Sequence, residues 1–408
     1  MNKEISVKEL GAAGDGKTDD TASIQATFDS SYDVIVIPKG VYRITKTLKI
    51  GSDKKIAADK NARLFMCGNV PKHRNDFLLT NSDTESGNSN IEIEGGIWDG
   101  NNQGKYNTKP DLFDKNGYSG TVLNFFNVKN LKLSDMTVAN SVTYNIRMSR
   151  LDGFEIRDIR FYSKRKAFNQ DGLHFGGEVR NGIVENISAV SKGQTNDDLI
   201  AFNADDSIER IENLDIVRGD IENITVKNVS AEDCHTFIRL LSVDASIRNI
   251  TIENISGGCR VCAVNMDAAR YCKTPLFNEN EKPYGAGNIE NVTIKNMNVH
   301  WSSKPNRYKD ALILCETVVN NLSILNFNRN KRKDKAKKIP TLIVRNVPGI
   351  NIDLTQSDNI KEKKAISHLC KFSTKSLVHN ATIYSDEEYR FNGSFKQLVL
   401  RQQVDYKQ

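Results

Sequence analysis

Two acidic segments of the sequence carry residue types that could perform acid–base chemistry. The first segment is Asn169–Phe175 (NQDGLHF) and the second is Asn196–Phe202 (NDDLIAF). They contribute three carboxylates, Asp171, Asp197 and Asp198. Three like charges in one groove cannot all ionise at their ordinary pKa, so at least one is expected to hold a proton near neutral pH. Such a group can act as the general acid that cleavage of a glycosidic bond needs.

The elements that position these segments form a repeat along the chain. Each copy is a turn residue followed by alternating apolar and polar residues, which predicts a short β-strand. The copies begin 23 to 42 residues apart. They are Asn90–Ile93, Asn130–Leu133, Gly153–Ile156, Gly182–Glu185, Asn223–Val226, Asn249–Ile252, Asn291–Ile294 and Asn321–Ile324.

A repeat of this kind predicts an all-β chain wound as a single-stranded right-handed parallel β-helix. In such a solenoid, inward side chains stack from coil to coil, and the bends need residues that tolerate a left-handed backbone, such as Asn and Gly. The shorter spacings fit one coil, while the longer ones leave room for a loop or a further coil. A sandwich or jelly roll is the alternative, but its hairpins would need regular Asn-Gly or Asp-Gly turns, which are sparse here.

Stacking of coils explains how the two acidic segments could meet. Asp171 and Asp197 are 26 residues apart, about one coil, so they are expected on adjacent strands roughly 4.8 Å apart. A lateral offset of the side chains could open this to the ~6.5–9.5 Å that fits a water molecule between acid and base. That separation predicts inversion at the anomeric carbon.

Strand alternation indicates which neighbours share the face of the acids. If the large apolar residues of each strand point into the coil, then His174, Asn203 and Arg239 point outward. Arg239 would offer a planar fork to a sugar carboxylate or to a pair of hydroxyls. Alternatively, it could form an ion pair with Asp233 or Asp244.

The first fifty residues differ from the rest. A glycine-rich turn at 11–16 leads into a predicted helix for which Thr18 or Asp19 is the expected N-cap. We expect residues 1–50 to form an N-terminal cap with the first strands, because the end of a solenoid exposes an apolar core and free strand edges. Residues 51–408 are expected to form the β-helix and an irregular closing segment, in one domain overall.

The residues so far described resemble those of a known superfamily. Val7–Thr21, with Ile24 and Gln25, resembles the N-terminal signature of the pectate lyase superfamily, which polygalacturonase-like glycosidases share with phage tailspike depolymerases. The series Asn169–Asp171, Asp197–Asp198 and Ile238–Leu240 is similar to the Asn-Thr-Asp, Asp-Asp and Arg-Ile-Lys motifs of glycoside hydrolase family 28. The similarity of pattern extends to about residue 300.

The resemblance implies an inverting glycoside hydrolase that acts on a plant or microbial glycan. It matches Asp197 with the family's general acid, and Asp171 and Asp198 with the pair that activates water. It also implies that Asn169, His174, Asn203, His235 and Arg239 line the substrate site.

The sequence departs from the family pattern in three respects, one of which is an added acidic pair at Asp205 and Asp206. Leu241 stands where the family has a lysine that follows the arginine, and the His-Gly motif is absent unless His235 takes its place. These departures make polygalacturonic acid itself a doubtful substrate and favour another glycoside.

Two other functions are compatible with these residues. The cluster of Asp197, Asp198, Asp205 and Asp206 could bind calcium in a β-eliminating polysaccharide lyase. A non-catalytic, carbohydrate-binding or tailspike-like β-helix could also keep the cap, the repeat and part of the groove. We expect no cofactor and no metal, and the general base of a lyase has no evident candidate beyond Arg239.

Composition adds limits on partners and location. The seven cysteines lack the spacing of a disulfide framework, which predicts reduced thiols. The net charge is +6, and much of the excess lies in a basic run at 330–338 that is expected to be a solvated loop. We therefore expect a carbohydrate partner, with neither nucleic acid nor membrane. The start of the chain lacks the order of a secretion signal, which predicts a cytoplasmic location unless a leader has been removed.

Overall fold

The computed structural model describes most of the chain up to residue 341 and isolated strands beyond it. The described residues are 3–67, 73, 75–102, 119–205, 217–267, 287–304, 311–315, 319–330, 332–337, 339 and 341, with strands lying between 342 and 401 whose side chains are not described. The protein is all-β apart from one helix, α1 (Thr21–Phe28). Among the described residues, no helix has the length and apolar character needed to cross a membrane.

The strands up to residue 203 are β1 (Glu4–Ser6), β2 (Asp15–Asp19), β3 (Val34–Ile37), β4 (Gly40–Ile44), β5 (Leu48–Ile50), β6 (Lys54–Met66), β7 (Leu79–Asn81), β8 (Asn88–Asp99), β9 (Leu123–Ser134), β10 (Thr137–Ala139), β11 (Ile146–Tyr162), β12 (Leu173–Phe175), β13 (Val179–Ala189) and β14 (Asp198–Asn203). Those that follow are β15 (Ile221–Leu241), β16 (Ile247–Asp267), β17 (Ile289–Trp301), β18 (Ile313–Cys315), β19 (Val319–Arg329), β20 (Leu342–Val344), β21 (Ile350–Asp353), β22 (Cys370–Phe372), β23 (Leu377–Val378), β24 (Ala381–Tyr384), β25 (Ser394–Phe395) and β26 (Leu398–Arg401).

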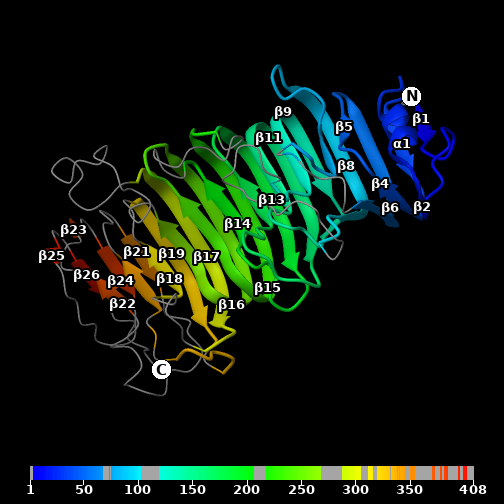
Figure 1. The fold of residues 1–408 in the computed structure, drawn as a ribbon. Helices are drawn as coiled ribbons and strands as arrows, with labels where there is room; N and C mark the ends of the chain where they lie inside the picture. The colour runs from blue at the N-terminus through cyan, green and yellow to red at the C-terminus, as the bar shows by residue number, and fades with distance from the viewer. Residues whose placement is uncertain are drawn as a thin grey trace, which may run out of the picture.

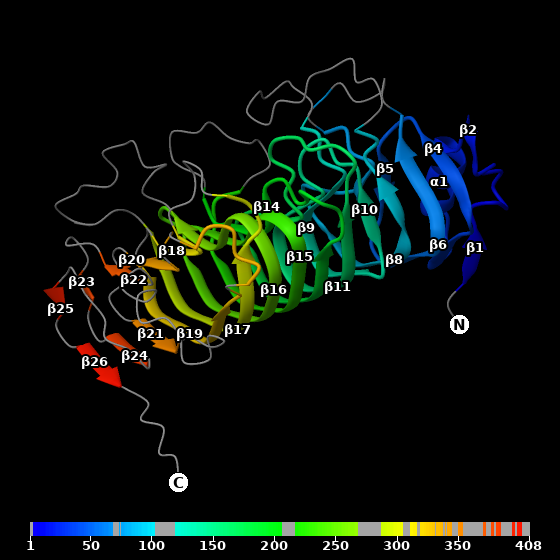
Figure 2. The same cartoon turned by 90° about the horizontal axis from the view of Figure 1, so that it is seen from below.

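These strands stack as successive coils of an elongated rod. The pairings between strands are parallel, and 24 strands join in one sheet. The rod runs from β1 and α1 at one end to β22 through β26 at the other (Figures 1 and 2). Strand pairing also crosses residue 50, because β6 pairs with both β3 and β4. The first fifty residues are therefore continuous with the following coils.

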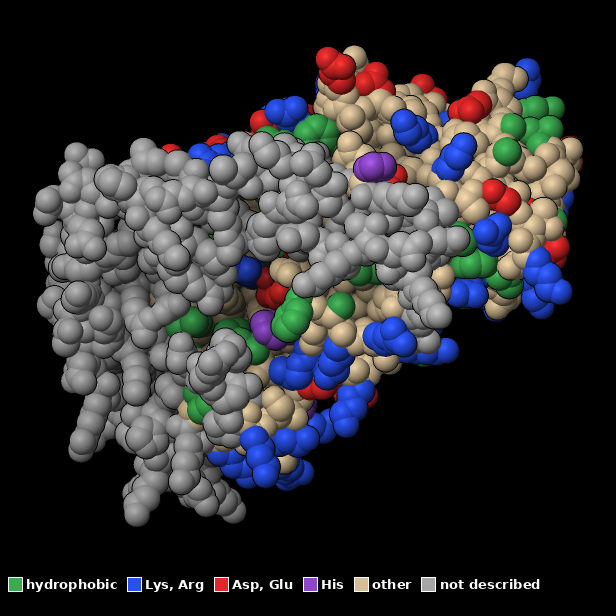
Figure 3. All heavy atoms as spheres, viewed as in Figure 1, with side chains coloured by type: hydrophobic (Ala, Val, Ile, Leu, Met, Phe, Trp, Pro, Cys, Tyr) green, Lys and Arg blue, Asp and Glu red, His purple; other side chains and the backbone are tan. Residues whose placement is uncertain are grey.

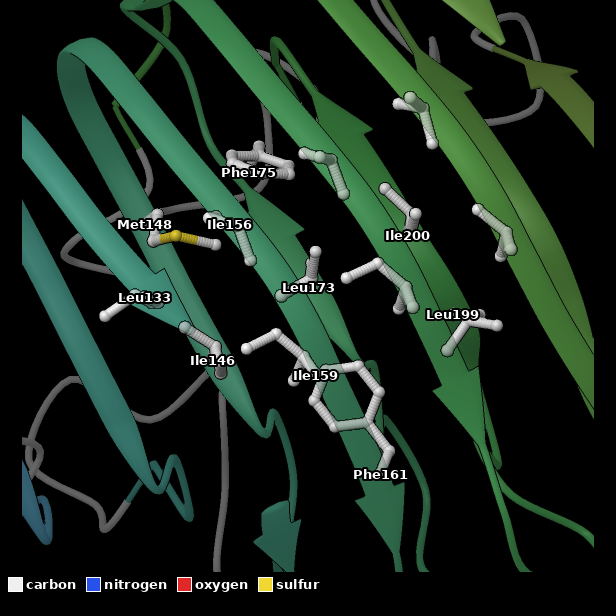
Figure 4. Packing of buried hydrophobic residues seen from close by; sticks show 14 of the residues in the cluster. Leu133, Ile146, Met148, Ile156, Ile159, Phe161, Leu173, Phe175, Leu199 and Ile200 are labelled. Atoms are coloured by element: carbon white, nitrogen blue, oxygen red, sulfur yellow. The ribbon is translucent and has the colours of Figure 1, made fainter. Parts of the chain in front are cut away.

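The core is a set of aliphatic and aromatic ladders inside the coils. Leu173, Ile200 and Ile238 occupy paired positions on consecutive strands and are buried. The rings of Phe175 and Phe202 stack with centroids 5.2 Å apart. Figure 4 shows such residues facing one another across the sheets. Burial of stacked apolar side chains is the main stabilising contribution to such a fold.

Asparagine ladders hold the bends of the coils. Asn181, Asn223, Asn249, Asn291 and Asn321 have positive φ, and from Asn223 onward each amide donates a hydrogen bond to the side chain of the preceding member. A second ladder has the same arrangement and comprises Asn186, Asn228, Asn254, Asn296 and Asn326. Asn adopts the left-handed conformation more readily than most residues. The expected Asn bends are therefore present.

The strands are longer than the sequence predicts. The expected short strand at Asn223–Val226 is one part of β15, which runs on to Leu241. Its pairing with β16 continues on both sides of the bend at Asn228. Adjacent coils thus bend at the same position and stay paired. One long strand therefore includes two segments that the sequence pattern separates.

The longest spacings between repeats correspond to single coils. Ile91 pairs with Leu131, Gly182 with Ile224 and Ile250 with Val292. Each pair lies 40 to 42 residues apart in the sequence, yet the two residues are neighbours on adjacent strands. The extra residues therefore belong to connections between strands, and no additional coil intervenes.

Helix α1 covers the N-terminal end of the core. Ile24 and Phe28 are buried in the same apolar cluster as the strands. The expectation that Thr18 or Asp19 is the N-cap is wrong, because Asp20 occupies that position. The Asp20 carboxylate accepts hydrogen bonds from the backbone N–H groups of Ala13 and Gly14 in the glycine-rich turn. Asp19 instead accepts from the N–H and hydroxyl of Thr21.

The described cysteines are free thiols, and the basic run is exposed as expected. Cys67, Cys234, Cys259, Cys262 and Cys315 form no disulfide with one another. In the basic run, the described lysines are exposed, while Asp334 is buried against the guanidinium of Arg329.

Candidate active site

The candidate site lies where four of five neighbouring strands carry a polar side chain at one aligned position. In register along β11, β12, β14, β15 and β16, the aligned positions are Arg147, His174, Ala201, Arg239 and Asn265. The residues on either side of each position are apolar and buried, as strand alternation requires. One outward row therefore crosses the middle coils of the rod.

Backbone hydrogen bonds bring the two acidic segments together. The N–H of Asp197 donates to the carbonyl of Gln170 at 3.4 Å, and the N–H of Gly172 donates to the carbonyl of Asp198 at 2.9 Å. These two bonds flank Asp171, which therefore lies beside Asp197 and Asp198 on the neighbouring coil. Asp198 begins β14, while Asp171 and Asp197 lie in the segments just before β12 and β14, so the three acids lie on two adjacent coils.

His174 orients Asp171. The ring Nδ1 of His174 lies 2.6 Å from Oδ2 of Asp171, and both side chains are buried. The ring of Tyr144 stacks on the His174 ring with centroids 4.2 Å apart. His174 is thus held by an aromatic face and a carboxylate at once. The sequence analysis did not identify Tyr144, which lies before β11 and has no polar motif around it.

Asp197 and His235 form the more accessible edge of the acidic group. Nδ1 of His235 lies 3.6 Å from Oδ1 of Asp197, and 27% of the Asp197 side chain is exposed. Acidic, histidine and basic side chains are visible side by side on the face of the molecule in Figure 3. His235 therefore lies beside the acids, where the family resemblance would place its missing histidine.

Asp198 is the buried member of the acidic pair. Burial raises the pKa of Asp198 to about 7, with a further contribution from the negative charge of Asp197. The Arg239 guanidinium opposes this increase in the pKa, since its Nη1 lies 3.6 Å from Oδ2 of Asp198. At neutral pH the pair of Asp197 and Asp198 can therefore hold a proton.

Arg239 makes its closest ion pair with Asp267. Nε lies 3.2 Å from Oδ1 of Asp267, and Nη2 lies 3.3 Å from Oδ2. The alternative partners expected from the sequence do not form this pair. Asp233 lies beside Arg260 instead. Asp267 is a residue that sequence reasoning missed, although it lies one coil beyond Arg239 at the end of β16.

Asn203 and Asn265 flank this ion pair. Asn203 pairs in register with Leu241, which in turn pairs with Asp267. The amide of Asn265 donates to Oδ2 of Asp267 at 3.2 Å. The Oδ1 atoms of Asn203 and Asn265 are buried without a hydrogen-bond partner among the described residues. Asn203 thus lies on the expected face, and Asn265 is an addition to it.

Arg147 occupies the β11 end of the row, and Asn169 lies outside the row, two residues before Asp171. Asn169 occupies a left-handed turn position (φ 57°), and no described contact links its side chain to the acids. Arg147 is almost completely buried, and its Nε donates to the side-chain oxygen of Asn124 at 2.9 Å. The sequence analysis did not select Arg147, because it stands in an ordinary alternating strand pattern.

The same acids are the candidates for metal binding. Ligand atoms of Asp197, Asp198 and His235 lie within 4.8 Å of one another. The wider calcium cluster expected for a lyase does not form, because the Asp205 carboxylate accepts hydrogen bonds from the backbone N–H groups of Val243, Asp244 and Ala245. Asp206 lies outside the described residues. The Asp205 carboxylate therefore stabilises the backbone turn at residues 243–245.

A large open groove lies elsewhere on the rod. Its volume is about 900 Å³, and it follows the second asparagine ladder past Asn186, Asn228 and Asn254. None of the three acids lines this groove. The candidate site is therefore identified by the chemical grouping of its side chains and not by this groove.

Sequence comparison relates the chain to plant polygalacturonases and to phage appendage proteins. An exopolygalacturonase of Zea mays is 24% identical over 330 residues, covering 71% of this chain and 75% of that protein. A probable polygalacturonase of Arabidopsis thaliana is 27% identical over 258 residues, covering 57% and 52%. A pre-neck appendage protein of Bacillus phage B103 is 38% identical over 101 residues, covering 24% and 11%. The chain thus spans about half of the Arabidopsis protein and a small part of the phage protein.

Solved structures with the same fold come from both groups. A family 28 exopolygalacturonase of Yersinia enterocolitica has a TM-score of 0.57 at 18% identity, covering 99% of this chain and 76% of that chain. The N-terminal fragment of bacteriophage phi29 gene product 12 has a TM-score of 0.60 at 15% identity, covering 97% and 66%. At these identities the likeness shows the fold alone.

The family assignment rests on the first two thirds of the chain. Residues 4–260 match the family described as rhamnogalacturonase A/epimerase, pectate lyase-like, and this range includes the cap, all three acids, His174, His235 and Arg239. The chain therefore belongs to this pectate lyase-like family and is similar to the polygalacturonases of glycoside hydrolase family 28.

Proposed function

We propose that the protein is an inverting glycoside hydrolase built on a right-handed parallel β-helix, and that Asp171, Asp197 and Asp198 carry the reaction. One observation supports this most strongly: the three acids lie on two adjacent coils, where burial raises the pKa of Asp198 to about 7. A proton held near neutrality beside a second carboxylate is what glycosidic cleavage requires. The substrate is a plant or microbial polysaccharide or oligosaccharide.

The contacts favour a specific division of roles. The pair of Asp197 and Asp198 supplies the proton, and the more exposed Asp197 delivers it to the leaving glycosidic oxygen. Asp171, oriented by His174, takes a proton from the water molecule whose oxygen attacks the anomeric carbon. The resemblance assigns Asp198 to the activation of water. Its burial and raised pKa favour the role of proton holder instead.

Two other functions remain to be separated from this one. The phage appendage similarity supports a binding-only protein, which would bind glycans without turnover. A β-eliminating lyase would need a base and commonly a cation. The guanidinium of Arg239, the base considered from the sequence, faces Asp267 and Asp198.

The test is turnover of a panel of plant and microbial glycans by the wild type and by Asp197→Asn. We expect the substitution to lower kcat at least ~10²-fold with the fold intact, the usual magnitude for a lost general acid. Asp135→Asn is the matched control, because Asp135 is an exposed residue at a left-handed bend, a conformation that Asn adopts readily.

Two further measurements distinguish a hydrolase from a lyase and from a binding protein. Turnover is expected to persist in EDTA and to release no product with ultraviolet absorbance from an unsaturated ring. Wild-type turnover by Asp197→Asn would contradict the assignment of the acid. Glycan affinity without turnover in the wild type would show a binding protein, and an unsaturated product would show a lyase.

A further inference from the structure

The donors of the candidate substrate-binding arginine are already directed at protein carboxylates. Nε and Nη2 of Arg239 face the two oxygens of Asp267, and Nη1 lies 3.6 Å from Asp198. Asp267 is fully buried, so this ion pair is poorly screened by water. A sugar carboxylate would have to compete with a fixed, two-point protein partner for the same guanidinium.

Two buried hydrogen-bond acceptors beside this ion pair have no partner among the described residues. The amide nitrogen of Asn265 donates to Asp267, which directs its Oδ1 away from that carboxylate. Asn203 and Asn265 are each more than nine-tenths buried, and neither Oδ1 atom has a hydrogen-bond partner among the described residues. A buried acceptor without a partner is costly. Hydroxyl groups can donate to such acceptors, whereas an ionised carboxylate offers acceptors only.

The charge around Arg239 also disfavours a uronate. Asp198 and Asp267 flank the single guanidinium, and Leu241 occupies the outward position two residues after Arg239. The other buried arginine of the row, Arg147, is three strands away from Arg239, roughly 14 Å at a strand spacing of ~4.8 Å. It therefore cannot neutralise a ligand carboxylate placed beside Arg239.

We propose that the subsite beside Arg239 binds an uncharged sugar residue through its hydroxyl groups, and that Asp267 is the residue that sets this specificity. Asp267 does so by binding the Arg239 guanidinium and the Asn265 amide nitrogen. The side-chain oxygens of Asn203 and Asn265 then accept hydrogen bonds from the sugar hydroxyls. The inference rests on the proposed function, since it assigns a preference to the same site. Asp267 is in this account a specificity-determining residue that acts through Arg239.

The first experiment compares matched substrates with the wild type. Each polysaccharide that the protein cleaves is tested before and after chemical reduction of its uronic acids to the corresponding neutral sugars. We expect kcat/KM to be unchanged or higher after reduction. A decrease of ~10-fold or more, the scale of one lost charge-assisted hydrogen bond, would overturn the inference while leaving hydrolysis established.

The second experiment removes the charge of Asp267. Asp267→Asn is expected to raise the ratio of kcat/KM for the uronate form over the reduced form by at least ~10-fold, because Arg239 can then bind a ligand carboxylate. Asp135→Asn changes the net charge equally on an exposed bend and is expected to leave the ratio unchanged. An unchanged ratio in a folded Asp267→Asn, checked by circular dichroism, would contradict the role of Asp267.

Sugar binding to the wild type tests the inference without turnover and without the Asp267→Asn variant. Ligand-detected NMR of the wild type compares how well galactose and galacturonate each displace a bound ligand. The bound ligand is the neutral product of the reaction or, failing turnover, a glycan that the protein binds. We expect galactose to compete better. Stronger competition by galacturonate would overturn the inference. If no glycan is cleaved, the proposed hydrolase fails, while this comparison still decides the preference of the site.

Discussion

At the scale of the residue, the three carboxylates of the candidate site differ in their burial and in their partners. Asp198 is buried with a raised pKa, Asp197 is partly exposed beside His235, and Asp171 is bonded to His174. Identical side chains can take different roles when their environments differ. The division proposed here follows from those environments and requires no further group in the reaction.

The pH dependence of the reaction tests this division. Because the pKa of Asp198 is about 7, the acidic pair loses its proton as the pH rises through that value. We expect kcat/KM, which reports the free enzyme, to fall above about pH 7. A rate that stays constant up to pH 9 would contradict a proton held by this pair.

The same group predicts the sign of a stability change. In the folded chain Asp198 keeps its proton up to about pH 7, whereas a model aspartate loses it near pH 3.8, so the wild type loses stability as the pH rises between these values. Asp198→Asn carries no such group. Its melting temperature relative to the wild type is expected to be higher at pH 8 than at pH 4. An equal difference at both pH values would contradict the burial of the charge.

The sequence predicted some site residues and missed others for a physical reason. Period-two alternation within a strand indicates which side chains share a face, and this led to His174 and Arg239. It gives no pairing between coils. The partner of Arg239 is therefore Asp267, one coil later, and not the sequence neighbours Asp233 or Asp244. Tyr144 lies outside the motifs for the same reason, since its contact with His174 joins adjacent coils.

At the scale of the element, the asparagine ladders set the corners of each coil. A left-handed bend is costly for most residues, and the ladder amides also hydrogen-bond to one another along the rod. The sequence predicted these bends correctly, because Asn and Gly tolerate that backbone. It did not predict how far the strands continue past them, since continuation depends on whether the adjacent coil turns in the same register.

The bend at Asn254 allows the two contributions to be separated. Asn254→Ala introduces a left-handed alanine and removes the hydrogen bonds to Asn228 and Asn296. Asn254→Gly removes the same hydrogen bonds but accepts the backbone conformation. We expect both variants to melt at a lower temperature than the wild type, with the alanine variant less stable by about 1 kcal/mol. Equal melting temperatures for Ala and Gly would show that the backbone conformation contributes little.

At the scale of the whole molecule, the candidate site lies on the middle coils and away from the ends of the rod. Helix α1 covers the N-terminal end of the rod, the three acids lie in or just before β12 and β14, and β15 and β16 carry the ion pair of Arg239 with Asp267 (Figure 1). The parallel pairing continues from β1 to the strands beyond residue 342. Pairing is continuous near residue 50, where β6 pairs with both β3 and β4, and the single-domain organisation stays a prediction.

The geometric outcome of the reaction tests the central claim most directly. Proton NMR during the first minutes of cleavage identifies the anomer of the new reducing end before it equilibrates. Hydrolysis by two carboxylates with water between them predicts a product of inverted configuration. A retained configuration, or an unsaturated sugar in place of a reducing end, would contradict the mechanism assigned to Asp171, Asp197 and Asp198.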